Sequence, residues 1–145
     1  MPVKYLRAFL IATFAFVPCQ SLLAQGGAAA TGIHAKEGFC TTMIQQFDLM
    51  STYTKSPGLG TDMNRRSKYF ADQKVLNATL LRTAPASLKT DVVLLTGDAN
   101  ASYDAQLSGN RAGTMASIGR LRSPQHLAAA KRANDYCGIK LTAAK

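Results

Sequence analysis

The sequence predicts an all-α protein, an up-and-down bundle of about four helices closed by one disulfide bond. Three observations lead to this fold class. Apolar residues recur at three- and four-residue spacing through most of the chain, which is the helical period. Breaks rich in Gly and Pro divide these stretches into units of helix length. No stretch shows the alternation of a half-buried strand in preference to the helical period, so no β-strand is expected.

The first two expected helices form the N-terminal half of the bundle. The first runs from about residue 35 to residue 53, where Cys40 and Phe47 lie on an apolar face at helical spacing. Residues 56–60, Ser-Pro-Gly-Leu-Gly, then break the chain. The second helix spans about 61–83, with Thr61 or Asp62 as its N-cap. Its inner stripe includes Gln73 and Asn77, which indicate either a polar pocket or a mutual hydrogen bond.

Three further helical stretches follow. One opens at Pro85, because the missing proline N–H would be unpaired in a first turn anyway, and it fades by residue 108. A short stretch over 113–121 is expected to turn Met115 inward. The last, 123–137, begins with a capping Ser followed by Pro and ends at Gly138, which is expected in the left-handed conformation. An up-down order places the first and last helices side by side and antiparallel.

The N-terminus is predicted to be a signal peptide. Lys4 and Arg7 form a positive segment before an apolar run over 8–17, which is too short to span a bilayer, and cleavage is expected near Ala24. The alternatives are an uncleaved anchor, or a lipoprotein modified at Cys19, although Cys19 lacks the small preceding residue of a lipobox. The predicted organisation is a signal peptide over 1–24, a flexible spacer over 25–34 with a mobile His34, and a bundle domain over 35–145. The predicted localisation is secreted or extracytoplasmic.

Two cysteines remain after such cleavage, Cys40 and Cys137. An even pair in an oxidising compartment predicts a disulfide bond. Cys40 lies near the start of the first expected helix and Cys137 near the end of the last, which fits an antiparallel arrangement of the two. The alternative is a pair of free, buried thiols.

The charge balance favours an anionic partner. The chain has 17 Lys and Arg against 8 Asp and Glu, and the signal peptide would remove two of the cations and none of the acids. Such a balance suits an anionic cell-envelope polymer, a lipid surface or a protein, or it only keeps the protein soluble; no specific nucleic acid is expected. The second helix is the most basic element. Its candidate basic patch, which is otherwise a solvated face over core aromatics, comprises Arg65, Arg66, Lys68 and Lys74.

Three motifs resemble a set of small secreted or lipid-anchored actinobacterial proteins. They are Cys40, the stretch 84–92 with its Ala-Pro turn leading into Leu-x-x-Asp-Val, and the closing stretch 134–138, Asn-Asp-Tyr-Cys-Gly. The resemblance implies a helical bundle, a disulfide bond and export. It carries no catalytic residue over, because that set has no agreed chemistry. This chain differs in lacking the lipobox that many of those proteins have.

The remaining motifs favour binding over catalysis. The chain has no His-Glu-x-x-His, no glycine-rich phosphate loop and no Gly-x-Ser-x-Gly, and its acids are scattered singly. We therefore favour a secreted or envelope-associated, non-catalytic protein that binds an anionic surface or a protein partner, with no cofactor and no metal site. A second hypothesis is a bundle core that holds haem or a small apolar ligand, with His126, Tyr69 and Tyr103 as candidate ligands. A hydrolase-type enzyme is the third.

Overall fold

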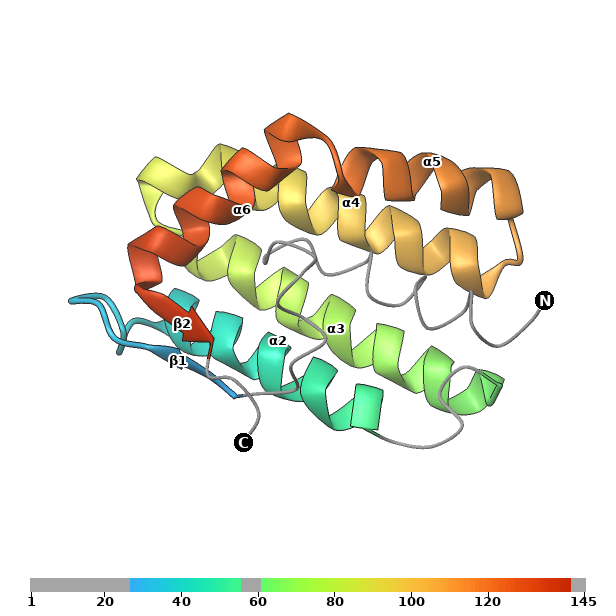
Figure 1. The fold of residues 1–145 in the computed structure, drawn as a ribbon, viewed down its shortest axis with the longest axis horizontal. Coiled ribbons are helices and arrows are strands. Elements are labelled where there is room, and N and C mark those ends of the chain that lie inside the picture. Colours follow the sequence, from blue (N-terminus) through green and yellow to red (C-terminus); the bar gives the residue numbers. More distant parts are fainter. Residues whose placement is uncertain (1–26, 56–60, 142–145) are drawn as a thin grey trace.

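The structure, a computed structural model, describes residues 27–55 and 61–141 (Figure 1). The predicted signal peptide and the predicted break at 56–60 lie outside the described residues. The all-α prediction is confirmed, with five α-helices in the described part in place of about four. In chain order the elements are β1 (Ala28–Ala30), α2 (Gly38–Lys55), α3 (Met63–Thr83), the short 3-10 helix η1 (Ala86–Leu88), α4 (Lys89–Leu107), α5 (Arg111–Leu121), α6 (Pro124–Cys137) and β2 (Ile139–Leu141).

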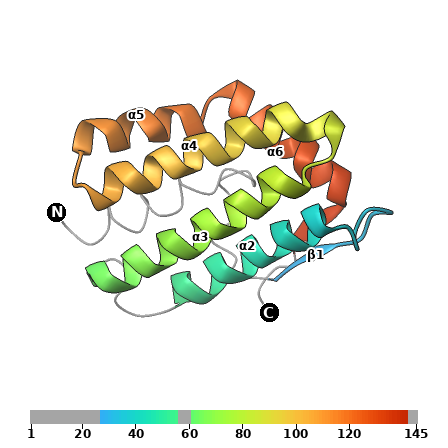
Figure 2. The same cartoon turned by 180° about the vertical axis from the view of Figure 1, so that it is seen from behind.

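The helices form two layers, α2 with α3 and α4 with α5 and α6 (Figures 1 and 2). α5 packs along the second half of α4, and α6 packs along its first half. Both helices are antiparallel to α4. The fourth helix of the bundle is therefore divided at Ser123, whose backbone is extended. The Ser123 hydroxyl accepts a hydrogen bond from the His126 N–H at 3.2 Å and so starts α6 as a new helix.

The residues that cap the start of α3 and the end of α6 are among those that the sequence predicts. The Asp62 carboxylate accepts hydrogen bonds from the N–H groups of Asn64 and Arg65 at 3.0 and 3.1 Å. At the end of α6, Gly138 has φ 58°, a left-handed conformation that a residue without a Cβ adopts at little cost.

The core consists of two apolar clusters. The first surrounds the disulfide bond and receives side chains from α2, α3, α4 and α6, among them Phe39, Leu80 and Leu95. The second is aromatic and lies further along the bundle, with Phe70 and Tyr103 among its members. Between the clusters the inner faces of α2 and α3 carry amide side chains.

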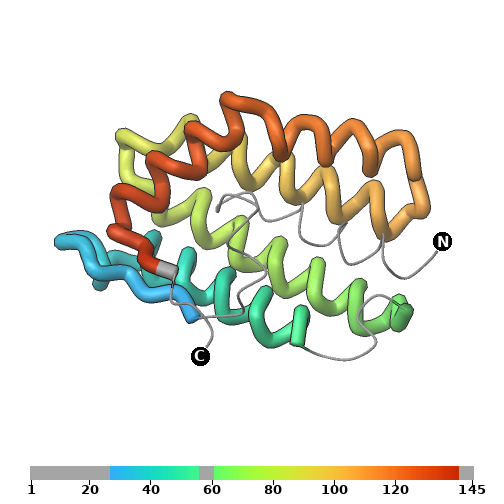
Figure 3. The backbone as a smooth tube through the Cα atoms, viewed as in Figure 1, coloured from blue at the N-terminus to red at the C-terminus, as the bar shows by residue number. Residues whose placement is uncertain are grey.

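The strands differ from the sequence prediction. β1 and β2 pair antiparallel, with Ala28 opposite Leu141 and Ala30 opposite Ile139, and Figure 3 shows the blue segment that contains β1 beside the red segment that follows α6. Residues 28–34 are therefore not a flexible spacer. The sequence does not predict this strand pairing, because each strand has only three residues and its partner is more than a hundred residues away.

Two details of helix packing also differ. α6 packs mainly on α4 and meets α2 only near the disulfide bond, because the break at Ser123 lets α6 cross the bundle end toward the start of α2. Met115 is 56% exposed. The buried side chains of α5 are Thr114, Ser117 and Leu121, a stripe that lets α5 approach α4 through small residues.

Candidate functional site

The predicted basic patch is partly neutralised. The Lys68 ammonium donates a hydrogen bond to the Asp72 carboxylate at 2.8 Å, and this bond raises the pKa of Lys68. The Lys74 ammonium pairs with Asp104 on α4. Asp104 is thirty residues away in the sequence, so local charge density could not reveal this pairing. Arg66 is half-buried.

An open cleft remains beside this patch, where the last turn of α2 lies near the first turn of α3. Its volume is about 430 Å³, and its lining contains two cations and no carboxylate. The lining residues are Thr52, Tyr53, Asn64, Arg65 and Lys68. A larger open hollow of about 690 Å³ lies between α4 and α5, and its two charged side chains, Asp104 and Arg120, are both paired.

Two of the three predicted ligand residues belong to the aromatic cluster. Tyr69 and Tyr103 are buried on either side of Phe70, whose ring centroid lies 5.7 Å from that of Tyr69 and 4.7 Å from that of Tyr103. Burial raises the pKa of both tyrosine hydroxyls. The phenolate form that binds haem iron is therefore disfavoured at neutral pH.

The third predicted ligand residue, His126, lies in the first turn of α6 and is 1% exposed. Its Nδ1 lies 2.9 Å from an Asp98 carboxylate oxygen, and Arg120 Nε donates to the other oxygen at 3.2 Å. One carboxylate of α4 thus holds α5 and α6 on both sides of the helix break. The structure therefore assigns His126 to this junction, not to a common site with the two tyrosines.

The inward-facing amides form a polar layer between the two apolar clusters. Gln46 Nε2 donates to Asn77 Oδ1 at 2.6 Å, and Asn77 Nδ2 donates to Asn100 Oδ1 at 2.7 Å, so the bonds join α2, α3 and α4. Gln73 Nε2 donates to the Tyr69 hydroxyl at 3.2 Å. The buried Gln73 Oε1 meets no protein donor in the described part of the chain. Gln73 and Asn77 are thus not bonded to each other but to different neighbours.

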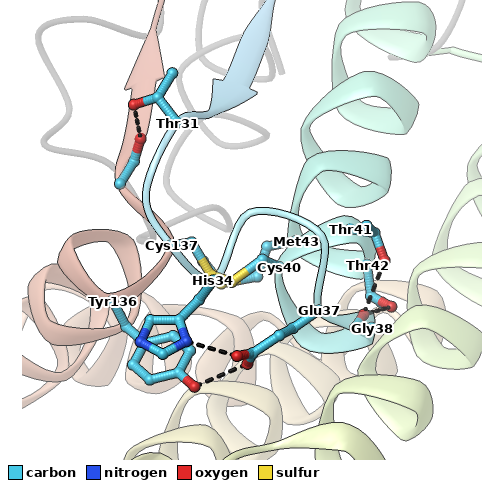
Figure 4. The surroundings of a disulfide bond; sticks show 11 residues. Thr31, His34, Glu37, Gly38, Cys40, Thr41, Thr42, Met43, Tyr136 and Cys137 are labelled. Atoms are coloured by element: carbon cyan, nitrogen blue, oxygen red, sulfur yellow. Dashed lines mark hydrogen bonds and ion pairs between the residues drawn. A yellow bond between two sulfur atoms is a disulfide. The ribbon is translucent and has the colours of Figure 1, made fainter.

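The disulfide bond joins the start of α2 to the end of α6. Cys40 and Cys137 are both buried, their Cα atoms are 5.4 Å apart, and they are separated by 97 residues (Figure 4). Two backbone bonds hold the N-terminal segment beside this bridge. The Thr31 N–H donates to the Gly138 carbonyl at 3.1 Å, and the Gly32 N–H donates to the Cys137 carbonyl at 3.3 Å. The predicted disulfide bond is therefore present and is part of a larger junction between the segment before α2 and the end of α6.

His34, predicted to be mobile, is held by its ring. The ring stacks on that of Tyr136 with centroids 4.0 Å apart (Figure 4). Glu37 bridges the two residues: one carboxylate oxygen lies 2.5 Å from His34 Nδ1, and the other accepts a hydrogen bond from the Tyr136 hydroxyl at 2.8 Å. The bonds to His34 and Tyr136 lower the pKa of Glu37. Only the His-x-x-Glu spacing in the sequence signals this contact, since Tyr136 is 99 residues away from Glu37.

The same end of the bundle carries exposed groups that sequence reasoning missed. Ile33, in the loop before α2, is 96% exposed. At this end, four exposed cations form no ion pair with any residue of the described part; Lys55, Arg111 and Arg122, elsewhere in the fold, also form none. We define the disulfide-end surface by these residues: Ile33, Lys36, Arg82, Lys89 and Lys140.

Contacts between the elements bring these cations to one end. Lys36 follows Ile33 in the loop, and Lys140 lies in β2 opposite Ala29. Arg82 is in the last turn of α3, which ends at Thr83, and a Cβ built on Gly38 of α2 would lie 3.6 Å from the Thr83 side chain. The Lys89 ammonium donates to the Leu81 carbonyl in that same turn. The cations therefore come from four segments that no local sequence pattern connects.

Residues 27–55 and 61–141 contain no group of three or more His, Cys, Asp or Glu side chains arranged to hold a metal ion. None of the helices in these ranges has the length and hydropathy needed to cross a membrane. Comparisons with known proteins found no match: no protein-family model matches the chain, and neither does any curated protein or solved structure. The resemblance to actinobacterial proteins stays a prediction.

Proposed function

We propose that the protein is an exported, non-catalytic binding protein that attaches to an anionic surface through the disulfide-end surface. One observation carries the proposal: Lys36, Arg82, Lys89 and Lys140 are exposed and have no carboxylate partner in the described part. All eight Asp and Glu residues of the chain fall within the described residues, so these cations are not paired with an acidic side chain elsewhere in the chain.

The electrostatic attraction of these four cations is large enough for reversible attachment to an anionic membrane. A Lys or Arg held near an anionic membrane contributes about 1 kcal/mol, so four of them contribute about 4 kcal/mol, roughly a thousandfold in affinity. Lys68 and Lys74 on α3 are already paired with Asp72 and Asp104, so they have less to offer a partner.

The buried disulfide bond supports export. Disulfide bonds persist in oxidising compartments and are rare where thiols are kept reduced. Cys40 and Cys137 are both fully buried. Export would bring the protein to the anionic lipids and polymers of the cell envelope, where a basic surface has partners.

Sedimentation with vesicles tests the proposal. The processed protein, purified from secreting cells, is mixed with vesicles of phosphatidylcholine alone or with phosphatidylglycerol added. We expect it to sediment only with the anionic vesicles at about 0.1 M salt and to be released at about 1 M, where the screening length falls to about 3 Å. A soluble polyanion should compete. Equal binding to both vesicles, or no binding to vesicles or polyanion, would contradict the proposal.

A further inference from the structure

We propose that loop 31–37 is a lipid anchor that inserts Ile33 into an anionic lipid layer while Lys36 and Lys140 contact the headgroups. The inference rests on the proposed function and selects a lipid surface over a hydrated polymer. It follows from one loop being held firmly while its largest aliphatic side chain contacts almost nothing.

The loop is held at several points. Its first residues bond to the backbone of Cys137 and Gly138, and the Thr31 hydroxyl also donates to the Gly138 carbonyl at 3.0 Å. Inside the loop the Ala35 N–H donates to the Gly32 carbonyl at 3.1 Å. Fixing each residue costs about 1–2 kcal/mol of backbone entropy, and these bonds and the nearby disulfide bond offset that cost.

The segment before α2 approaches the end of α6 so closely that glycine is required at position 138, and a side chain at position 32 would make a tight contact. A Cβ on Gly138 would lie 2.6 Å from the Gly32 nitrogen, and a Cβ on Gly32 would lie 3.3 Å from the Cys137 carbonyl group. This contact places the loop against the end of α6, directly beside the disulfide bond. The position of Ile33 is therefore set by the contact of its loop with the end of α6 beside the disulfide bond.

The direction of the side chains is the decisive observation. The ring of His34 turns in and stacks on Tyr136, whereas Ile33 remains 96% exposed. Burying the Ile33 side chain would be favourable by about 1 kcal/mol or more, and its exposure in a loop held by several hydrogen bonds leaves this aliphatic group available to a partner. An aliphatic group gains little from a hydrated polyanion and much from the acyl boundary of a bilayer.

The charges near Ile33 complement an anionic bilayer. Lys36 is three residues from Ile33, and Lys140 lies on the exposed side of the β1–β2 pair. The one acid of the loop, Glu37, is directed toward the rings of His34 and Tyr136 (Figure 4). A short apolar group flanked by lysines is the arrangement that favours the membrane interface, where charge and apolar burial act together.

A single tryptophan reports on insertion, because the chain contains none. Ile33→Trp, the loop variant, places the reporter at the proposed anchor. Met115→Trp is the matched control variant, since Met115 is 56% exposed on α5, away from the loop. Each processed variant is titrated with phosphatidylglycerol-containing vesicles, and emission, acrylamide quenching and sedimentation are measured on the same samples. Ile33→Ala and Val75→Ala, both at exposed aliphatic positions, are compared by sedimentation alone.

We expect the tryptophan emission of the loop variant to shift to the blue and become protected from acrylamide, while that of the control variant changes little. Ile33→Ala should weaken sedimentation about tenfold, as loss of buried aliphatic groups predicts, and Val75→Ala should not. Sedimentation of the loop variant without a shift in its emission would overturn the lipid anchor but leave the proposed function standing. Failure of both tryptophan variants to sediment, while a soluble polyanion still binds, would overturn the anchor and assign the surface to a polymer. If the tryptophan emission of the loop variant shifts on addition of a protein partner but not on addition of vesicles, the lipid anchor is also overturned.

Discussion

The two ends of the bundle are built differently. At the disulfide end, the segment before α2 and the segment after α6 meet through a covalent bond, backbone pairing and a ring stack. Lys36, Arg82, Lys89 and Lys140 have no carboxylate partner there in the described part, whereas Lys131 and Arg132 of α6 are paired with Asp135 and Asp91. At the opposite end, where α3 begins, an aromatic cluster fills the interior and Lys68 is paired, whereas the exposed Lys55 and Arg111 form no ion pair with a described residue. Charge density along a sequence is therefore a poor guide to a binding surface, because ion pairs formed across the fold decide which charged side chains remain available to a partner.

The largest expected effect is loss of the disulfide bond. Cys40→Ala with Cys137→Ala should lower the free energy of unfolding by about 4 kcal/mol, since the bridge closes a loop of 97 residues. Denaturant titration measures the loss. Amide hydrogen exchange should also show faster exchange at Thr31 and Gly32, whose N–H groups bond beside the bridge. Unchanged protection at these two amides would show that the disulfide end holds together without its covalent bond.

The opposite end should tolerate loss of the bridge but not loss of its aromatic packing. Phe70→Ala should cost about 3–5 kcal/mol, because Phe70 is buried between Tyr69 and Tyr103. The exchange rates of Thr31 and Gly32, relative to global unfolding, should change less than in the cysteine variant. If they change as much, the two ends are one cooperative unit and the comparison between them fails.

Disrupting the polar layer between the two ends should lower the free energy of unfolding by an intermediate amount. Asn77→Ala leaves Gln46 Nε2 and Asn100 Oδ1 without their partner and should cost about 2–4 kcal/mol in denaturant titrations. A cost below about 1 kcal/mol would mean that the layer contributes little to joining the three helices.

The two buried tyrosines make a matched pair. Tyr69→Phe removes the hydroxyl that accepts the Gln73 amide and should cost about 1–3 kcal/mol. Tyr103→Phe removes a hydroxyl that makes no hydrogen bond within the described part, so the cost should stay below about 0.5 kcal/mol. Equal costs would contradict the hydrogen bonding described for the aromatic cluster.

Acid should weaken the disulfide end. Hydrogen bonds from His34 and Tyr136 lower the pKa of Glu37, and those from Arg132 lower the pKa of Asp91. The stability that each carboxylate contributes is therefore fully present above its ordinary pKa of about 4 and is lost as the pH falls through the lowered value. Glu37→Gln with Asp91→Asn should flatten the fall in unfolding free energy below about pH 4. An unchanged slope would assign the acid sensitivity to other carboxylates.

Much of the fold was predictable because it rests on local patterns. Helical spacing located α2 to α6 within a few residues, and Asp62, Ser123 and Gly138 are recognisable caps. The β1–β2 pair and the stack of His34 on Tyr136 were not predictable, because each joins short segments from opposite ends of the chain. The availability of Lys36 and Lys140, and the pairing of Lys74, likewise depend on which acids the fold brings near.

The central claim is that the disulfide end, not the opposite end, faces the anionic partner. Two double variants test it at equal net charge: Lys36→Gln with Lys140→Gln, and Arg65→Gln with Lys68→Gln. Binding to phosphatidylglycerol-containing vesicles at about 0.1 M salt should fall roughly thirtyfold for the first pair, because two cations near the surface contribute about 2 kcal/mol. The second pair should lose about threefold or less. An equal loss, or a larger loss for Arg65 and Lys68, would contradict the account and return the binding surface to the cleft beside α3.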